Sequence, residues 1–229
     1  MLSQSVDPDC IKASADKLKI RYTPLHGAGY RLVPEALSRA GFKNLETVPT
    51  QIVPNGNFPT VEKPNPQFIE AFSEALSMGN DCDLIIATDP DADRMGVAVQ
   101  NSNGEFKALS GNEIALILLD YIIRARKQKN TMPKNPAVVK SLVSSSLAEV
   151  MCRRNGIEIF NVYTGFKYIG EKIKEFERDC SYSFIFGFEE SYGYLAGTYA
   201  RDKDGVLASL LIAEAAGYYK LHSLSLLDA

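Results

Sequence analysis

Short segments rich in β-favouring residues alternate with longer segments of helical periodicity along almost the whole chain. This alternation is the strongest constraint on the fold, because βαβ units form mainly parallel sheets with helices packed on their faces. It therefore predicts an α/β protein. We expect strands at 17–22, 45–49, 83–87, 95–100, 137–142, 158–163 and 184–188, and helices at 31–40, 66–78, 113–127, 144–155, 166–178 and 205–220.

Turn-forming residues separate these segments. Gly41, Gly79 and Gly156 each follow an expected helix, where glycine commonly ends it. Asn103-Gly104 indicates a hairpin-like turn. A break near 102–110 divides the pattern into two similar halves, so we expect two consecutive α/β domains. Each would have a mainly parallel, mixed sheet flanked by helices, at residues 1–106 and 107–229.

Composition excludes several classes of protein. The 229 residues carry 28 acidic and 25 basic side chains, and this balance does not favour a nucleic-acid partner. The four cysteines form no C-x-x-C pair, which favours free thiols in a reducing compartment. The N-terminus lacks the features of a secretory signal, and the apolar stretch at 114–123 is too short to span a membrane. We therefore expect a cytoplasmic protein without membrane contact.

An acidic loop follows the apolar segment at 83–87 and carries the clearest chemical signal. Asp89, Asp91 and Asp93 occupy alternate positions, so in extended backbone their carboxylates project to the same side. Converging carboxylates repel one another unless a cation compensates them, and Mg²⁺ prefers such oxygen ligands. Arg94 follows directly and could hold a phosphate or brace the carboxylates.

Three other interpretations of this loop fit its residues less well. A solvated acidic turn is common, but here an apolar strand directs the carboxylates to a sheet edge where α/β proteins bind ligands. An EF-hand loop requires glycine and glutamate where this chain has Arg94 and Gln100. Phosphatases of the haloacid dehalogenase type usually have threonine or valine at the position of Asp93.

The loop Asp89-Pro-Asp91-Ala-Asp93-Arg94 resembles the D-G-D-x-D-R metal loop of the α-D-phosphohexomutases, with proline replacing glycine. Gly187 to Gly193 (GFEESYG) is similar to the sugar-recognition loop of that family, in the form typical of phosphoglucomutases. Further similar segments occur in family order at 22–27, 55–60, 164–167 and 201–205. The resemblance covers nearly the whole chain and implies the second and third domains of such an enzyme.

The resemblance also implies residue roles. Asp89, Asp91 and Asp93 would bind Mg²⁺, and Arg94 would serve the phosphoryl group, with a structural ion pair as the alternative. Lys203 would act as general acid or base, provided that burial or a neighbouring cation such as Arg201 lowers its pKa. The remaining candidates would bind substrate: Glu189 and Ser191 through the sugar hydroxyls, together with Thr164, Gly165, Lys167 and His26. Thr164 could instead cap a helix, and His26 could be a turn residue.

The implied activity is the interconversion of hexose 1-phosphate and hexose 6-phosphate through a bisphosphate, with glucose 1,6-bisphosphate as activator. The family's phosphoserine loop and C-terminal phosphate-binding loop are not found here, since Ser144 to Ser146 lacks the flanking His-Asn-Pro. We therefore expect the chain alone to be inactive, with the first and fourth domains as its partners. A phosphopentomutase, a glucose 1,6-bisphosphate synthase or a non-catalytic phosphosugar-binding module remain alternatives.

Overall fold

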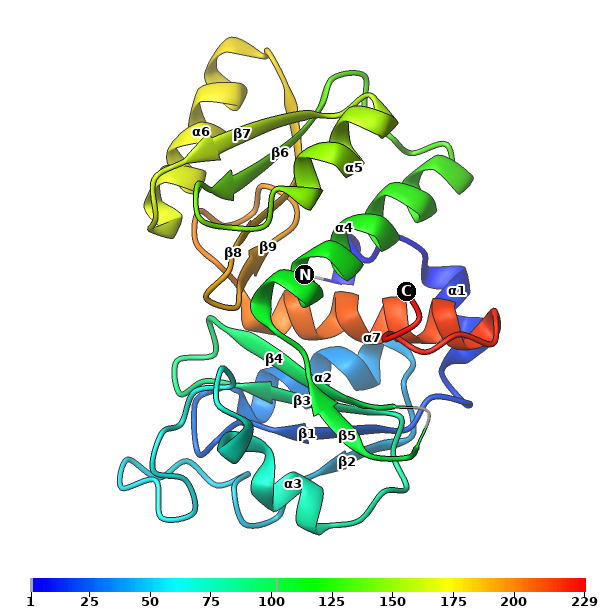
Figure 1. Ribbon diagram of the computed structural model, residues 1–229, viewed down its shortest axis with the longest axis vertical. Helices are drawn as coiled ribbons and strands as arrows, with labels where there is room; N and C mark the ends of the chain where they lie inside the picture. The colour runs from blue at the N-terminus through cyan, green and yellow to red at the C-terminus, as the bar shows by residue number, and fades with distance from the viewer. Residues whose placement is uncertain (1, 102) are drawn as a thin grey trace.

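Two α/β layers are stacked in the computed structural model, which describes residues 2–101 and 103–229 (Figure 1). One sheet lies at the bottom of the view and the other at the top. Helices α4 (Gly111–Gln128) and α7 (Gly205–Leu221) lie between them. The two consecutive α/β units with mixed sheets confirm the predicted fold class.

The first sheet has the order β2-β1-β3-β4-β5. Strands β1 and β2 run parallel to each other and β1 runs parallel to β3, whereas β4 and β5 are antiparallel. A hairpin joins β4 to β5, as the turn at Asn103-Gly104 predicted. The bounds are β1 Ile20–Thr23, β2 Leu45–Thr47, β3 Leu84–Thr88, β4 Met95–Gln100 and β5 Phe106–Ala108. Strand β5 was not expected, and it crosses the division proposed after residue 106.

The helices of the first unit are α1 (Pro8–Ser14), α2 (Gly29–Ala40) and α3 (Ser73–Ser77), with 3-10 turns η1 (Leu2–Gln4) and η2 (Ile69–Phe72). Helix α1 was missed by the sequence analysis. Its start is nevertheless well marked, because the Asp7 side chain accepts hydrogen bonds from the amides of Asp9 and Cys10, and Pro8 occupies the first turn.

The single helix expected at 66–78 was wrong. Only η2 and α3 form, because the Asn65 side chain accepts a hydrogen bond from the Gln67 amide at 2.9 Å and makes a local turn. Pro66 also packs against β4, where a Cβ on Gly96 would lie 2.6 Å from the proline ring. This tertiary contact holds the segment out of a helix. Gly79 does end α3, with φ of 102°.

The second sheet has the order β7-β6-β8-β9. Strands β6, β7 and β8 are parallel, and the short β9 returns antiparallel to β8. Strand β9 was not expected, because three residues are too few for a periodic pattern. The bounds are β6 Pro136–Ser141, β7 Glu158–Val162, β8 Ser183–Glu189 and β9 Gly193–Leu195, with helices α5 Leu147–Asn155 and α6 Phe166–Asp179.

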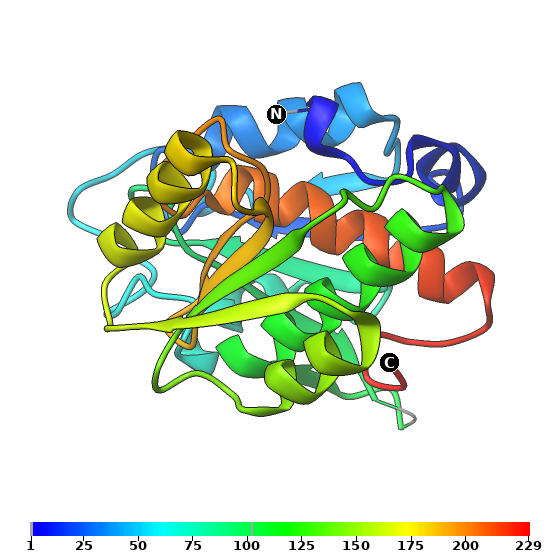
Figure 2. The ribbon, with the colours of Figure 1, turned by 90° about the horizontal axis from the view of Figure 1, so that it is seen from above.

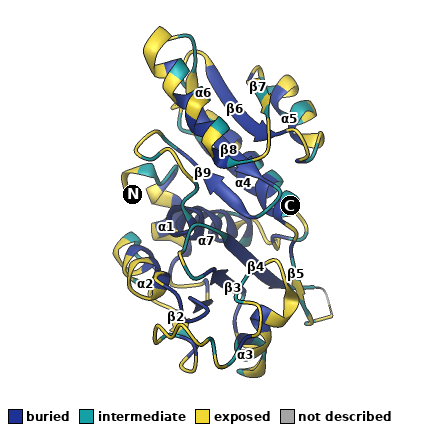
Figure 3. Ribbon diagram, turned by 90° about the vertical axis from the view of Figure 1, so that its left-hand side faces the viewer, coloured by how far each residue is buried: buried dark blue, intermediate teal, exposed yellow. Residues whose placement is uncertain are grey.

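Helix α7 joins the two units into one core. Nearly all of its side chains are buried, and it contacts α1, α2, α4, β3 and β4 (Figures 2 and 3). An apolar helix without a polar face is expected only where protein surrounds it on all sides. The largest hydrophobic cluster accordingly runs from Ile11 to Leu226 and includes both units. None of the helices in the described part of the chain has the length and apolar character of a membrane span.

A buried carboxylate on α7 fixes the N-terminal segment. Glu214 is fully inaccessible to solvent and accepts hydrogen bonds from the Asp7 amide, from the Tyr121 hydroxyl at 2.7 Å and from the Ser5 hydroxyl at 2.9 Å. Burial raises the pKa of Glu214, and these hydrogen bonds oppose the rise only in part. The charged form is therefore disfavoured in the folded protein.

Replacing this carboxylate tests the argument. A carboxyl whose pKa is raised by folding contributes stability below its unfolded pKa and loses it as pH rises through the folded pKa. Glu214→Gln keeps the acceptor oxygen and has no charge to bury. We expect it to match the wild type in acid and to become relatively more stable toward neutral pH. Urea unfolding at several pH values measures this difference, and a constant difference at all pH values would contradict it. The exposed Glu171→Gln is the control.

Candidate functional site

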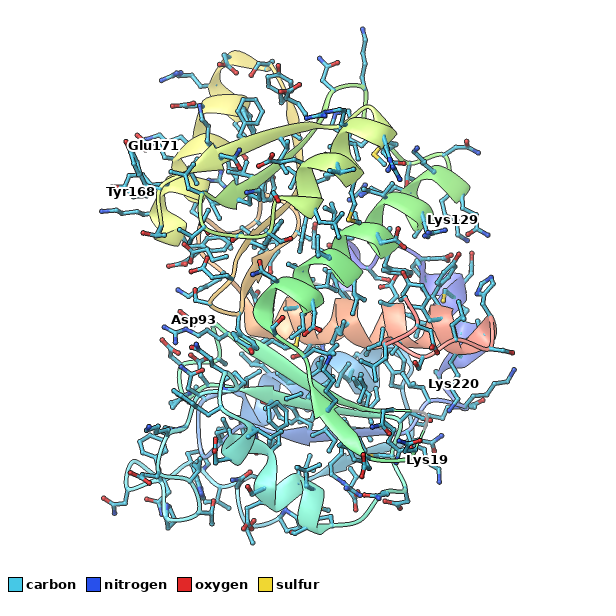
Figure 4. The ribbon with its side chains drawn as sticks, viewed as in Figure 1. Lys19, Asp93, Lys129, Tyr168, Glu171 and Lys220 are labelled. Atoms are coloured by element: carbon cyan, nitrogen blue, oxygen red, sulfur yellow. The ribbon has the colours of Figure 1, made fainter. Side chains whose placement is uncertain are left out.

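The acidic loop leaves the first sheet at the carboxyl end of β3. One carboxylate oxygen from each of Asp89, Asp91 and Asp93 lies within 4.8 Å of the other two. Asp89 is buried and accepts a hydrogen bond from the Arg94 amide at 3.0 Å, which curls the loop back on itself. Figure 4 shows Asp93 at the left, at the level where the two units meet.

Basic side chains partly compensate the three carboxylates. Lys203 Nζ lies 2.7 Å from Asp93 Oδ2, and Arg94 Nε lies 3.6 Å from Asp89 Oδ2. Asp93 Oδ1 is buried yet has no hydrogen-bond partner among the described residues. A close set of carboxylate oxygens with one oxygen unused suits a hard divalent cation, and Mg²⁺ fits this donor set.

The ionisation of the cluster reflects its burial. Burial raises the pKa of Asp89 to about 7; the Arg94 amide opposes the rise, and the carboxylates of Asp93 and Asp91 add to it. For Lys203, burial lowers the pKa, but the contact with Asp93 outweighs burial and the net pKa is raised. Lys203 is therefore protonated at neutral pH in this arrangement, and a protonated lysine can act as a general acid.

Arg201 does not lower the pKa of Lys203 in the way considered from the sequence. Its guanidinium pairs with Glu177 on α6 and donates a hydrogen bond to the Ala200 carbonyl at 3.1 Å. The charge of Arg201 is thus balanced by a carboxylate of helix α6. The charged neighbour of Lys203 is therefore the acidic Asp93 and not the expected cation.

Close backbone contacts clamp the acidic loop from both units. The Ala28 amide, before α2, donates to the Pro90 carbonyl at 2.7 Å, and the Gly205 amide, at the start of α7, donates to the Ala92 carbonyl at 3.0 Å. A Cβ on Gly205 would lie 2.6 Å from that carbonyl oxygen. A surface cleft lined by Ala28, Asp91, Asp93, Lys203 and Val206, among others, opens at this junction.

The second unit presents Glu189 at the end of β8. Its Oε1 accepts a hydrogen bond from the Gly165 amide at 2.6 Å, so two segments that each carry candidate substrate-binding residues lie together. Burial raises the pKa of Glu189, the Gly165 amide opposes the rise, and the charge of Lys203 also lowers it. Ser191 lies in the turn between β8 and β9. An isolated bridge from Arg94 to Gly193 joins this hairpin to the acidic loop.

The other substrate-binding candidates, His26, Thr164 and Lys167, differ in burial and in their contacts. His26 is buried, and its ring nitrogens are engaged by the Val53 carbonyl at 3.2 Å and the Thr60 hydroxyl at 2.9 Å. The imidazole thus fixes the loop at 51–60 and has no free nitrogen for a substrate. Thr164 and Lys167 are exposed at the N-terminus of α6, and Lys167 Nζ lies 4.9 Å from the centre of the Tyr168 ring. Thr164 does not cap α6, because the cap residue is Gly165.

Glu190 received no role from the sequence, yet its carboxylate is held by two side chains. Its Oε2 accepts hydrogen bonds from the hydroxyls of Ser141 at 2.7 Å and Ser144 at 3.2 Å. The signal available in the sequence is its place beside Glu189 at a strand end, since neighbouring residues there project to opposite sides. The serine partners could not be identified without the fold.

Substitution at Gly205 tests the clamp. Alanine is the better helix former, so propensity alone predicts that Gly205→Ala stabilises α7 slightly. The contact with the Ala92 carbonyl predicts the opposite, a loss of about 1–3 kcal/mol from forced displacement of the acidic loop. Thermal and urea unfolding measure the change. Gly56→Ala is the matched control, because a Cβ at Gly56 meets nothing within 4 Å; equal behaviour of the two variants would refute the clamp.

Comparison with known proteins identifies the family. Residues 1–104 match the model of phosphoglucomutase/phosphomannomutase α/β/α domain II, and residues 110–228 match that of domain III. The phosphoglucomutase of Staphylococcus aureus (strain USA300) is 38% identical over 213 residues, which are 92% of this chain and 38% of that protein. The chain therefore spans well under half the length of such relatives.

Solved structures share the fold at lower identity. A phosphoglucomutase/phosphomannomutase family protein from Burkholderia thailandensis has a TM-score of 0.70 and 17% identity, covering 94% of this chain and 43% of that one. The N-acetylphosphoglucosamine mutase of Aspergillus fumigatus, in complex with GlcNAc-6P and magnesium, has a TM-score of 0.61 and 15% identity, covering 93% and 50%. Together with the domain matches over most of its length, these findings show that the chain belongs to the phosphoglucomutase/phosphomannomutase family and carries its domains II and III.

Proposed function

We propose that the chain forms the metal- and sugar-binding half of a phosphoglucomutase-type enzyme that interconverts hexose 1-phosphate and hexose 6-phosphate through a bisphosphate. The observation that carries this proposal is the Asp89, Asp91 and Asp93 cluster, met by Lys203 from the other unit. The relatives named phosphoglucomutase support the reaction class. Phosphoryl transfer depends mainly on positioning and charge neutralisation, and the junction between the acidic loop and Lys203 can supply both.

The three aspartates are proposed to hold Mg²⁺, in line with the magnesium complex of the fungal mutase. When bound, the ion would neutralise charge that develops on the transferring phosphoryl group. Arg94, which lies 3.6 Å from Asp89 and 3.8 Å from Asp93, is proposed to contact a phosphoryl oxygen. Lys203 is placed to give a proton to the sugar hydroxyl or to take one from it.

The second unit is proposed to recognise the sugar. Glu189 can accept hydrogen bonds from sugar hydroxyls while the Gly165 amide holds its other side, and Ser191 presents its hydroxyl from the adjacent turn. Thr164 and Lys167 are exposed beside Gly165 and are proposed as outer contacts to the phosphosugar. His26 is proposed to act indirectly, by holding the loop at 51–60.

The phosphoserine and the terminal phosphate-binding loop are proposed to come from the first and fourth domains of the longer, cytoplasmic protein. Glucose 1,6-bisphosphate would then act as activator, and the present chain alone would not turn over substrate. The same site would serve a phosphopentomutase or a glucose 1,6-bisphosphate synthase, so assays should include pentose phosphates. If the chain binds phosphosugar but adding the first and fourth domains produces no turnover, a non-catalytic binding module would be supported instead.

Metal binding is expected to depend on the carboxylate cluster. Asp91→Asn removes one anionic ligand without disturbing the contact of Asp93 with Lys203, and the affinity for Mg²⁺ should fall roughly tenfold or more. Calorimetry or competition with Mn²⁺ monitored by electron paramagnetic resonance measures it. The control is Asp16→Asn, an exposed aspartate whose side chain pairs with Lys43 at 3.2 Å. Equal affinities in the two variants would exclude the cluster as the metal site.

Lys203 is expected to be essential in the full-length enzyme. Lys203→Met removes the proton carrier, so kcat in a coupled assay with glucose 1-phosphate should fall by about 10²- to 10⁴-fold. Lys174→Met, which changes an exposed lysine on α6, is the control. The 229-residue chain should show no turnover in the same assay. Full activity of the Lys203 variant would remove that residue from the mechanism.

A further inference from the structure

The two adjacent glutamates at the end of β8 point to different neighbours. Glu189 accepts a hydrogen bond from the Gly165 amide before α6, whereas Glu190 accepts them from the hydroxyls of Ser141, the last residue of β6, and Ser144, just after it. The β8–β9 turn is therefore tied at once to the loops that follow β7 and β6. These three loops form the carboxyl edge of the second sheet, where α/β proteins place ligands.

The serine partners are themselves held in place. Ser141 is fully buried and Ser144 nearly so, and their hydroxyl oxygens lie 2.7 Å apart. The buried Lys140 ammonium donates to the Ser144 carbonyl at 3.2 Å, and Asn112 Oδ1 accepts a hydrogen bond from the Ser145 amide at 2.8 Å. A carboxylate bonded to such a preformed loop has little freedom to move, so Glu190 rests on a rigid support.

The turn is also fixed at its other end. Tyr192 has φ of 69°, its carbonyl accepts a hydrogen bond from the Met95 amide at 3.1 Å, and its hydroxyl donates to the Leu109 carbonyl at 3.2 Å. The Glu190 carbonyl packs on α4, where a Cβ on Gly111 would lie 2.0 Å from its oxygen. Ser191 lies between these two anchored residues, so its direction follows from theirs.

We propose that Glu190, through Ser141 and Ser144, is a positioning residue that sets the orientation of the turn, and with it the Glu189–Gly165 hydrogen bond and the direction of Ser191. Glu190 touches no reacting group and acts only through its neighbours. Its consequence for sugar binding rests on the function proposed for Glu189 and Ser191. The bracing itself can be measured without any ligand.

The Gly165 amide provides that measurement. A short hydrogen bond to a carboxylate moves an amide proton downfield, and Gly165 lies far from residue 190 in the sequence. In ¹H–¹⁵N spectra of the 229-residue chain, Glu190→Ala should move the Gly165 amide signal upfield. Glu190→Gln should largely restore it, because the glutamine oxygen can take the place of Oε2 and accept hydrogen bonds from both serine hydroxyls. The Ser141→Ala, Ser144→Ala double variant should reproduce the effect of Glu190→Ala.

Two controls separate positioning from other effects. Glu171→Ala removes an exposed carboxylate from α6 and should leave the Gly165 signal unchanged. A Gly165 signal unchanged in Glu190→Ala would overturn the proposal, even if the melting temperature fell, because the carboxylate would then stabilise the fold without orienting Glu189. Equal upfield shifts in Glu190→Ala and Glu190→Gln would also overturn it, since loss of charge rather than of geometry would explain them.

Titration with glucose 6-phosphate distinguishes this inference from the proposed function. Where the wild-type chain binds the ligand, Glu190→Ala should weaken binding by roughly tenfold, the equivalent of one or two hydrogen bonds. If no phosphosugar binds while the Gly165 signal responds as expected, the bracing is established and the role of Glu189 in sugar recognition fails. Unweakened binding in Glu190→Ala would show that the brace does not serve recognition.

Discussion

Mutual repulsion of three carboxylates is the constraint on which the site depends. Asp89, Asp91 and Asp93 belong to the first unit, but Lys203, which contacts Asp93, belongs to the second. Arg94 compensates the cluster from within the first unit, but the closer cation, Lys203, reaches it only when the two units are docked. In such a partly buried position, unpaired charge is costly, so the ion pair links the electrostatics of the loop to the packing of the whole chain.

Helix α7 makes that docking possible. It begins two residues after Lys203, and its first residue, Gly205, touches the acidic loop before the helix continues between the two sheets. The same helix therefore sets the position of the proton-carrying lysine and fills the shared core. Glu189 and its turn are held by the neighbouring loops of the second sheet and reach the acidic loop through the Arg94–Gly193 bridge. Packing of α7 and of these loops thus holds residues from both units in fixed positions around one site.

Local patterns predicted most of the strands and helices, because β3, β6 and α7 carry strong apolar signals and glycine ends α2, α3 and α5. The failures have physical causes. Strands β5 and β9 have three residues each, too few to show periodicity. The segment after Asn65 does not form the expected helix, because the Asn65 side chain makes a local turn and Pro66 packs against Gly96. The aspartate triplet was visible in the sequence because its residues are local.

The sequence by itself determined the α/β alternation, the carboxylate spacing and the resemblance to the family, since each depends on residues close together in the chain. Only the tertiary structure decided which distant groups meet. It paired Lys203 with Asp93, turned Arg201 away to Glu177, occupied both nitrogens of His26 and gave Glu190 its serine partners. The reason is physical: charge compensation and hydrogen bonding act over a few ångströms of space, and that proximity arises only when separate elements pack together.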